Sequence, residues 1–126
     1  NFYGPFRDAV GSNKFFKSDK KNYQMDFRNS SESIREVALD IKEGADLIMV
    51  KPGMPYLDVI KLVKDSFKIP VFAYQVSGEY SIIKLGVKNK LINNESILES
   101  LISFKRAGAT AIVSYFALEI AKKLKN

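Results

Sequence analysis

Short apolar runs alternate with amphipathic stretches along most of this chain. Apolar runs of this length predict strands that are buried on both faces of a parallel sheet. The predicted strands are residues 45–50, 70–76 and 110–115. Apolar positions at i, i+3, i+4 and i+7 spacing predict the helices. The predicted helices are residues 33–43, 56–67, 80–87, 94–107 and 116–124. The capping-box pattern Ser33-x-x-Glu36 opens the first of them, and Gly44 ends it.

The order of these elements predicts an α/β fold with parallel strands joined by right-handed crossovers. A closed TIM (β/α)8 barrel usually needs about 250 residues, whereas this chain has 126. Because so few strands cannot close a barrel, we expect its C-terminal portion, the last three β/α units. The chain begins Asn1-Phe2-Tyr3-Gly4, without an initiator Met or a charged leader, which also indicates a piece of a longer protein.

The start of the chain differs from the rest. Residues 1–31 are rich in Gly, Asn, Ser, Lys and aromatic residues, and they show no sustained hydrophobic period. Loops of this length inside compact domains are uncommon and are usually functional, for example as active-site lids. We therefore expect a lid loop over 1–31, and a helix with three β/α units over 32–126, within a single domain.

Composition excludes several kinds of chemistry. The chain has no Cys and no His, so it cannot itself form disulfides, thiolate nucleophiles, Ser–His dyads or the common zinc sites. Its net charge of +6 is spread over lysines that alternate with acidic residues, which favours a solvated surface over a nucleic-acid or membrane partner. No apolar run approaches the roughly 18 residues of a membrane span.

Polar residues follow each predicted strand, at the edge where parallel α/β folds bind ligands. The segments are Lys51-Pro52-Gly53, Ser77-Gly78-Glu79 and Ser114-Tyr115. Lys51 directly follows four apolar residues, and burial there would favour the neutral amine over the ammonium ion. A neutral amine attacks a carbonyl group and forms an imine. On position alone, an exposed strand-end lysine stays open as the alternative.

The other polar candidates also allow two interpretations. Ser77 is either an ordinary turn residue or a hydroxyl donor to a carboxylate, and Tyr115 is either a core aromatic, which position alone favours, or a phenol that donates to a ligand. Arg7 and Lys20 suit the binding of an anion, although solvated loop charges are more common.

Several segments in one collinear order carry more information than spacing alone. They are Phe-Tyr-Gly-Pro-Phe-Arg-Asp-Ala at 2–9, Tyr-Gln-Met-Asp at 23–26, Arg-Glu-Val-Ala-Leu-Asp at 35–40, Met-Val-Lys-Pro-Gly-Met-Pro-Tyr-Leu-Asp at 49–58, Tyr-Gln-Val-Ser-Gly-Glu-Tyr at 74–80, and Lys-Arg-Ala-Gly-Ala at 105–109 leading into Ser-Tyr-Phe at 114–116. Together they resemble the porphobilinogen synthase family, also called delta-aminolevulinic acid dehydratase. The Met-Val-Lys-Pro-Gly segment resembles the Schiff-base motif of that family.

The resemblance implies a (β/α)8-barrel lyase that condenses two molecules of 5-aminolevulinate into porphobilinogen, in tetrapyrrole and heme biosynthesis. Lys51 matches the lysine that forms the imine with the second, A-side substrate. The family has a second reactive lysine at the end of the preceding strand, and its place would lie upstream of Asn1. We therefore expect the chain alone to be inactive.

The resemblance also assigns roles within the lid. Arg7 and Lys20 match two basic positions that hold the A-side carboxylate, and Gln24 matches a lid glutamine near the same site. Tyr3 and Phe6 match aromatic residues packed around the substrate.

Further matches lie outside the lid. Ser77 and Tyr115 match the pair that hydrogen-bonds the P-side carboxylate, and Tyr74 matches a ring near the P-side imine. Glu36 matches a carboxylate of an allosteric Mg2+ site near a subunit boundary. A catalytic Zn2+ or Mg2+ would be held by residues upstream of this chain.

The family resemblance further implies a homo-octamer, located in the cytoplasm or, in a plastid-bearing organism, in the plastid. Two other functions remain as alternatives. Another Schiff-base-forming class I aldolase-type TIM-barrel lyase would share Lys51 but would not predict the aromatic and basic lid. A non-catalytic basic binding module would use the positive charge and would not need Lys51.

Overall fold

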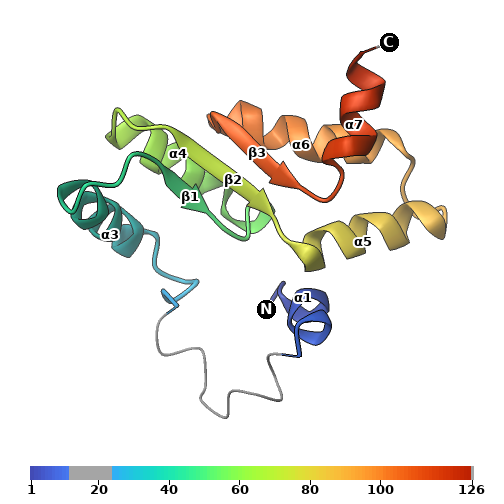
Figure 1. Ribbon diagram of the computed structural model, residues 1–126, viewed down its shortest axis with the longest axis horizontal. Coiled ribbons are helices and arrows are strands. Elements are labelled where there is room, and N and C mark those ends of the chain that lie inside the picture. The colour runs from blue at the N-terminus through green and yellow to red at the C-terminus, as the bar shows by residue number, and fades with distance from the viewer. Residues whose placement is uncertain (12–23, 126) are drawn as a thin grey trace.

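The computed structural model, which describes residues 1–11 and 24–125, contains a sheet of three parallel strands (Figure 1). In spatial order the strands are β1 (Ile48–Val50), β2 (Val71–Gln75) and β3 (Ala111–Ser114). Val50 pairs with Ala73, and Gln75 pairs with Ser114. The predicted parallel arrangement is therefore confirmed, and the carboxyl ends of the strands lie along one edge.

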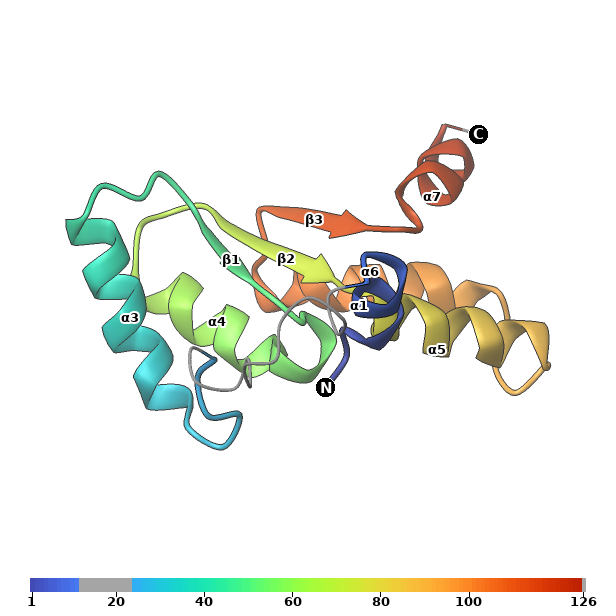
Figure 2. The ribbon, with the colours of Figure 1, turned by 60° about the horizontal axis from the view of Figure 1, so that its bottom comes forward.

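Helices pack along one face of this sheet (Figure 2). α3 (Ser30–Lys42) contacts α4 (Leu57–Ser66), and α4 contacts both β2 and α6 (Glu95–Ala107). The remaining elements are α1 (Gly4–Ala9), the 3-10 turn η2 (Met54–Tyr56), α5 (Ser77–Lys88) and α7 (Ala117–Leu124). α1 lies beside the start of α5, so the beginning of the chain is close to the carboxyl ends of the strands (Figure 1).

The hydrophobic core lies between the sheet and the helices on this face. Its members with no exposed surface are Ile60, Val63, Val71, Ala73, Ile97 and Phe104. Full burial of a large apolar side chain contributes roughly 1.5–3 kcal/mol relative to exposure. Packing of this kind, rather than helix propensity, accounts for most of the stability of short helices such as α4.

The opposite face of the sheet is open. Side chains alternate between the two faces of a strand, and on this face Met49 pairs with Phe72, and Tyr74 with Val113. Met49 and Val113 are each 38% exposed. In the part of the chain that the structure describes, no helix covers them (Figure 2). A face of this kind becomes the interior of a barrel when further strands close it.

The helix boundaries differ from the prediction at two places near the start of the chain. The expected loop over 1–31 was wrong for Gly4–Ala9, where Pro5 in the first turn supports helix α1. α3 begins at Ser30, because the side chain of Asn29 caps it by accepting a hydrogen bond from the amide of Glu32. The hydroxyl of Ser33 instead donates to the carbonyl of Ser30, so the predicted capping box was wrong.

Two further boundaries follow from hydrogen bonding. β1 is shorter than predicted because its pairing with the neighbouring strand begins only at Ile48, whose amide donates to the carbonyl of Pro70. α5 begins directly at Ser77, whereas the sequence predicted that this helix starts at Tyr80. The predicted stop at Gly44 is confirmed, since this residue follows α3 with a φ of 101°, a conformation that favours glycine.

The core position of Ile60 gives a stability test. Ile60→Ala should lower the free energy of unfolding by about 2–5 kcal/mol, because it leaves a cavity in a packed core. Leu62→Ala on the same helix is the matched control, because Leu62 is 37% exposed, and should cost clearly less. Urea unfolding of the chain at low concentration, followed by circular dichroism, measures both. Equal losses for the two variants would contradict this core.

Candidate active site

The polar residues predicted at the strand ends do lie along one edge of the sheet. Lys51 directly follows β1, Ser77 begins α5 two residues after the end of β2, and Tyr115 directly follows β3. Lys51 is exposed in this structure. The burial expected for Lys51 is therefore not supplied by the described residues.

The turn that follows Lys51 is tightly packed. Pro52 and Gly53 are buried, and the bond between Lys51 and Pro52 is cis. A Cβ atom placed on Gly53 would lie 2.5 Å from Cε1 of Phe104 and 3.2 Å from the carbonyl oxygen of Tyr74. Only glycine therefore lets this turn rest against α6 and β2.

Glu79 connects this turn to the start of α5, a role that the sequence pattern does not predict. Its carboxylate accepts hydrogen bonds from the amides of Val76 (2.5 Å), Met54 (2.6 Å) and Gly53 (3.3 Å). Glu79 is 2% exposed. Burial raises the pKa of this carboxyl above its ordinary value, and the three amide hydrogen bonds oppose that rise.

The first residues of the chain are hydrogen-bonded to the same region. The amide of Phe6 donates to the hydroxyl oxygen of Ser77 at 3.1 Å, and the amide of Gly78 donates to the carbonyl of Phe2 at 2.8 Å. A Cβ atom on Gly78 would lie 2.3 Å from that carbonyl oxygen, so the approach needs glycine. Ser77 is buried, and its hydroxyl proton remains available to a ligand while its oxygen accepts from Phe6.

Aromatic residues gather at the ends of β2 and β3. The hydroxyls of Tyr74 and Tyr115 are 3.5 Å apart, and the rings of Tyr80 and Tyr115 have centroids 5.4 Å apart. The hydrogen bond to Tyr115, together with burial, raises the pKa of Tyr74 to about 12. Tyr115 is 49% exposed, so the interpretation of it as a core aromatic was wrong. It follows a strand whose open face has no cover in the described part of the chain.

A buried polar network fixes the strands beneath this cluster. Gln75 has no exposed surface; its amide oxygen accepts from the hydroxyl of Ser114 at 2.6 Å. Its amide nitrogen donates to the hydroxyl of Ser100 on α6 at 3.0 Å. The Ser114 hydroxyl oxygen also accepts from the amide of Phe116 at 3.0 Å, at the start of the last helix. β2, β3, α6 and the chain after Tyr115 are therefore held in one arrangement.

The predicted lid residues lie in different environments. The guanidinium carbon of Arg7 is 5.5 Å from the ring centroid of Tyr3, within the range of a cation–π contact. Phe6 is 50% exposed, and Gln24 is also exposed. Lys20 lies outside the described residues.

Glu36 lies away from the strand ends. It is exposed on α3, the helix that packs against α4 on the outer side of the sheet. Residues 1–11 and 24–125 contain no group of three or more acidic or histidine side chains that could hold a metal ion. The described residues thus supply fewer than three such ligands at this position.

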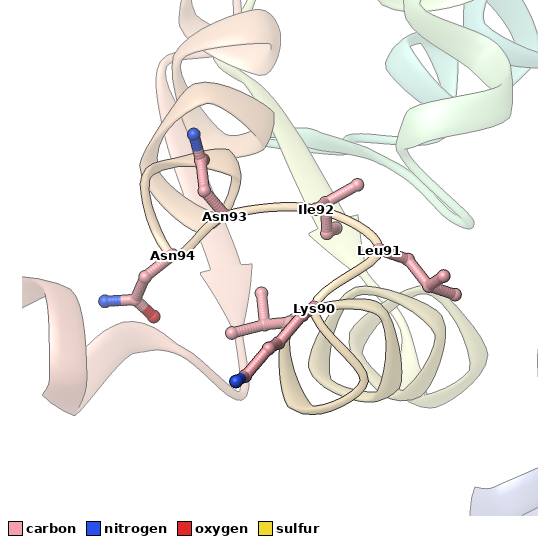
Figure 3. Close-up of a pocket in the computed structure, with 6 residues that line it drawn as sticks. Lys90, Leu91, Ile92, Asn93 and Asn94 are labelled. Atoms are coloured by element: carbon pink, nitrogen blue, oxygen red, sulfur yellow. The ribbon is translucent and has the colours of Figure 1, made fainter.

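A surface hollow of about 370 Å3 lies at the turn between α5 and α6 (Figure 3). Its lining residues are Val87, Lys90, Leu91, Ile92, Asn93 and Asn94. The hollow is at the far end of α5 from Ser77 and does not include the strand-end residues. It therefore does not mark the candidate site, which is open on the side of the uncovered sheet face.

This fold and site define a class of proteins. Consecutive parallel β/α units with a lysine, a serine and tyrosines at the strand ends are typical of a segment of a (β/α)8-barrel enzyme. No helix among the described residues has the length and apolar character needed to cross a bilayer.

Comparison with known families gives the more specific assignment. The model of the family described as "Delta-aminolevulinic acid dehydratase" matches residues 1–123. The chain belongs to this family. The match sets aside the class I aldolase and basic-module alternatives.

Individual relatives agree with this membership. Delta-aminolevulinic acid dehydratase of Bradyrhizobium diazoefficiens is 58% identical over 99% of this chain and 36% of the relative. The protein of that name from Archaeoglobus fulgidus is 55% identical over 99% of this chain and 38% of the relative. The chloroplastic protein of Pisum sativum is 52% identical over 98% of this chain and 31% of the relative. The chain thus spans about a third of the length of these relatives.

A solved structure supports the fold. The delta-aminolevulinic acid dehydratase (porphobilinogen synthase) of Toxoplasma gondii, in complex with the reaction product porphobilinogen, superposes with a TM-score of 0.92 at 50% identity. The superposition covers 97% of this chain and 35% of that chain. The expected fold class, part of a TIM barrel, is confirmed.

The packing of Gly53 gives a second stability test. Gly53→Ala should destabilise the chain by about 1–3 kcal/mol, because its Cβ would overlap the Phe104 ring and the backbone of β2. Gly4→Ala is the matched control, since a Cβ there meets nothing within 4 Å. Urea unfolding compares the two. A Gly53→Ala variant as stable as Gly4→Ala would show that the turn is not packed in this way.

The tyrosine pair gives a test by titration. Tyr115→Phe should lower the pKa of Tyr74 from about 12, because the hydrogen bond to Tyr115 is the largest cause of its rise. NMR of 13C-labelled tyrosine rings, titrated between pH 9 and pH 12 in steps of about half a unit, follows each phenol around its ordinary pKa of about 10. Tyr56→Phe serves as the control on another element. An unchanged Tyr74 titration in Tyr115→Phe would contradict the contact.

Proposed function

We propose that this chain is the C-terminal part of a porphobilinogen synthase, a lyase that joins two molecules of 5-aminolevulinate. The observation that carries the proposal is the position of Lys51, directly after β1 and on the same sheet edge as Ser77 and Tyr115. Family membership supports it. So does the likeness to the Toxoplasma gondii protein, whose structure contains porphobilinogen.

Lys51 is the proposed nucleophile. Its amine nitrogen attacks the ketone carbon of 5-aminolevulinate, and the resulting carbinolamine loses one water to leave a carbon–nitrogen double bond. The imine withdraws electrons from the neighbouring carbon, which can then lose a proton and form a new bond. Lys51 is exposed in the described structure. In the complete barrel, further strands and the lid would cover it and exclude water.

The carboxylate end of a substrate has suitable partners nearby. Ser77 keeps a hydroxyl proton to donate, and half-exposed Tyr115 presents its phenol at the end of the next strand. Hydrogen bonds from such groups to a carboxylate are charge-assisted and therefore stronger than neutral ones. We propose that Ser77 and Tyr115 hold the P-side carboxylate, with the ring of Tyr74 beside its imine.

The start of the chain is the proposed lid over the A-side substrate. Arg7, Lys20 and Gln24 would hold its polar end, while Tyr3 and Phe6 would pack around it. The hydrogen bonds from Phe6 to Ser77 and from Gly78 to Phe2 support this placement, since they bring the segment to the strand ends.

Other parts of the proposal concern residues outside this chain. A second reactive lysine and a catalytic Zn2+ or Mg2+ would be supplied by the remaining barrel. Glu36 is the proposed ligand of an allosteric Mg2+, but a site there needs ligands from elsewhere, because the described residues gather no metal-binding cluster. We also propose a homo-octamer that acts in the cytoplasm or, as the name of the Pisum sativum relative would suggest, in a plastid.

The test uses a reconstituted enzyme, defined as the Bradyrhizobium diazoefficiens relative in which this chain replaces the matching segment. Lys51→Arg keeps the charge but removes the nucleophile, and should lower pyrrole formation from 5-aminolevulinate by about 10³-fold or more. Lys68→Arg, an exposed lysine before β2, is the matched control and should be unaffected. Colorimetric pyrrole assay measures the rates.

Borohydride trapping identifies the site of the imine. Peptide mapping should find one substrate molecule bound to Lys51. It is joined with the loss of one water, and its carbon–nitrogen bond has been reduced. Full activity in Lys51→Arg would contradict the proposal. The 126-residue chain alone should form no pyrrole, because it lacks the rest of the barrel. Turnover by the isolated chain would contradict the two-lysine scheme.

A further inference from the structure

Glu79 is a buried acid that the proposed reaction does not use. It lies in the first turn of α5 and is 2% exposed, beneath the edge that carries Lys51 and Ser77. A charged carboxylate is costly to bury unless hydrogen bonds compensate it. Its contacts therefore show what it contributes to this region.

The carboxylate is shared between two turns. Its Oε1 atom accepts from the amide of Met54 at 2.6 Å, and its Oε2 atom accepts from the amides of Gly53 at 3.3 Å and Val76 at 2.5 Å. Gly53 is two residues after Lys51, and Val76 directly precedes Ser77. One side chain thus holds the backbone next to both candidate site residues.

Helix capping explains only part of this arrangement. An acid at this position caps α5 by accepting from the amide of Val76. The bonds from Gly53 and Met54 come from the turn after another strand, 26 and 25 residues away in sequence. A cap does not need them. Glu95, in the first turn of α6, is exposed and makes no such bridge within the described part of the chain.

We propose that Glu79 is a positioning residue that fixes the turn after Lys51 against the start of α5. It sets the distance between the imine-forming nitrogen and the carboxylate-binding hydroxyl of Ser77. The catalytic consequence rests on the proposed function, whereas the bridge itself does not. Misplacing a reactive group by about 1 Å can cost about 10²-fold in rate.

The bridge has a specific chemical requirement. All three partners are backbone N–H donors, so the side chain must offer acceptors on both terminal atoms. Glu79→Gln keeps the length but turns one acceptor into an amide donor that faces an N–H group. Glu79→Asp keeps both acceptors but is shorter by one methylene, so it should reach one turn and strain the contact with the other.

The experiment compares Glu79→Gln, Glu79→Asp and the matched control Glu95→Gln in the reconstituted enzyme. The measurements are single-turnover borohydride trapping of 5-aminolevulinate on Lys51, steady-state kcat and KM, and hydrogen exchange of the 52–57 and 75–78 backbone. We expect Glu79→Gln to slow trapping by about 10–100-fold. The value of kcat should fall by a larger factor than the factor by which KM changes. Glu79→Asp should recover part of the loss, and Glu95→Gln should match the unmodified enzyme.

The outcomes separate this proposal from the proposed function. Trapping and kcat at unmodified rates in Glu79→Gln or, if that variant does not fold, in Glu79→Asp would overturn the positioning role. If the unmodified enzyme forms no imine on Lys51, the proposed function fails. Hydrogen exchange then still tests whether Glu79 bridges the two turns. Faster exchange at both turns in a folded Glu79 variant, but not in Glu95→Gln, would support the bridge, and unchanged exchange would overturn it.

Discussion

The strand-end geometry depends on one buried carboxylate. Glu79 accepts backbone hydrogen bonds from the turn after β1 and from the residue that precedes α5, so two loops that could move separately share a single anchor. Burial of the charge raises the pKa of Glu79, which means that desolvation outweighs the stabilisation from the three amides. This cost fits the proposed role of Glu79 in positioning the two turns.

A second layer lies beneath that anchor. Gln75 joins Ser114 on β3 to Ser100 on α6, so β2 cannot slide past its neighbours without breaking buried hydrogen bonds. Gly53 lets the turn after Lys51 rest against the ring of Phe104. The covered face of the sheet is thus held by packing and buried hydrogen bonds. The side chains of Met49 and Val113 on the opposite face, and Lys51 at the strand end, are exposed in the described residues. This contrast explains how a segment of about a third of its relatives' length keeps Lys51, Ser77 and Tyr115 together at one edge of the sheet.

Much of this architecture could be predicted from the sequence, because strands and helices of α/β proteins have different hydrophobic periods. The pattern placed Lys51 at a strand end, and family motifs named Ser77 and Tyr115 beside it. It could not reveal Glu79, because the bonds that define its role come from residues 25 and 26 positions earlier. The exposure of Tyr115 was predicted wrongly for a related reason. Burial of an aromatic residue at a strand end depends on contacts with other strands, and hydrophobic periodicity does not show these contacts. Gly4–Ala9 was missed because so short a helix has no measurable period, although Pro5 was a usable signal.

NMR of the 13C- and 15N-labelled chain shows whether the carboxylate of Glu79 binds both turns. The Cδ signal of Glu79 is followed with pH together with the amide signals of Gly53, Met54 and Val76. We expect one shared titration, with the pKa of Glu79 above its ordinary value and all three amide signals moving with it. Amide signals of Gly53 and Met54 that stay unchanged while Glu79 titrates would show that Glu79 does not bind the turn after Lys51.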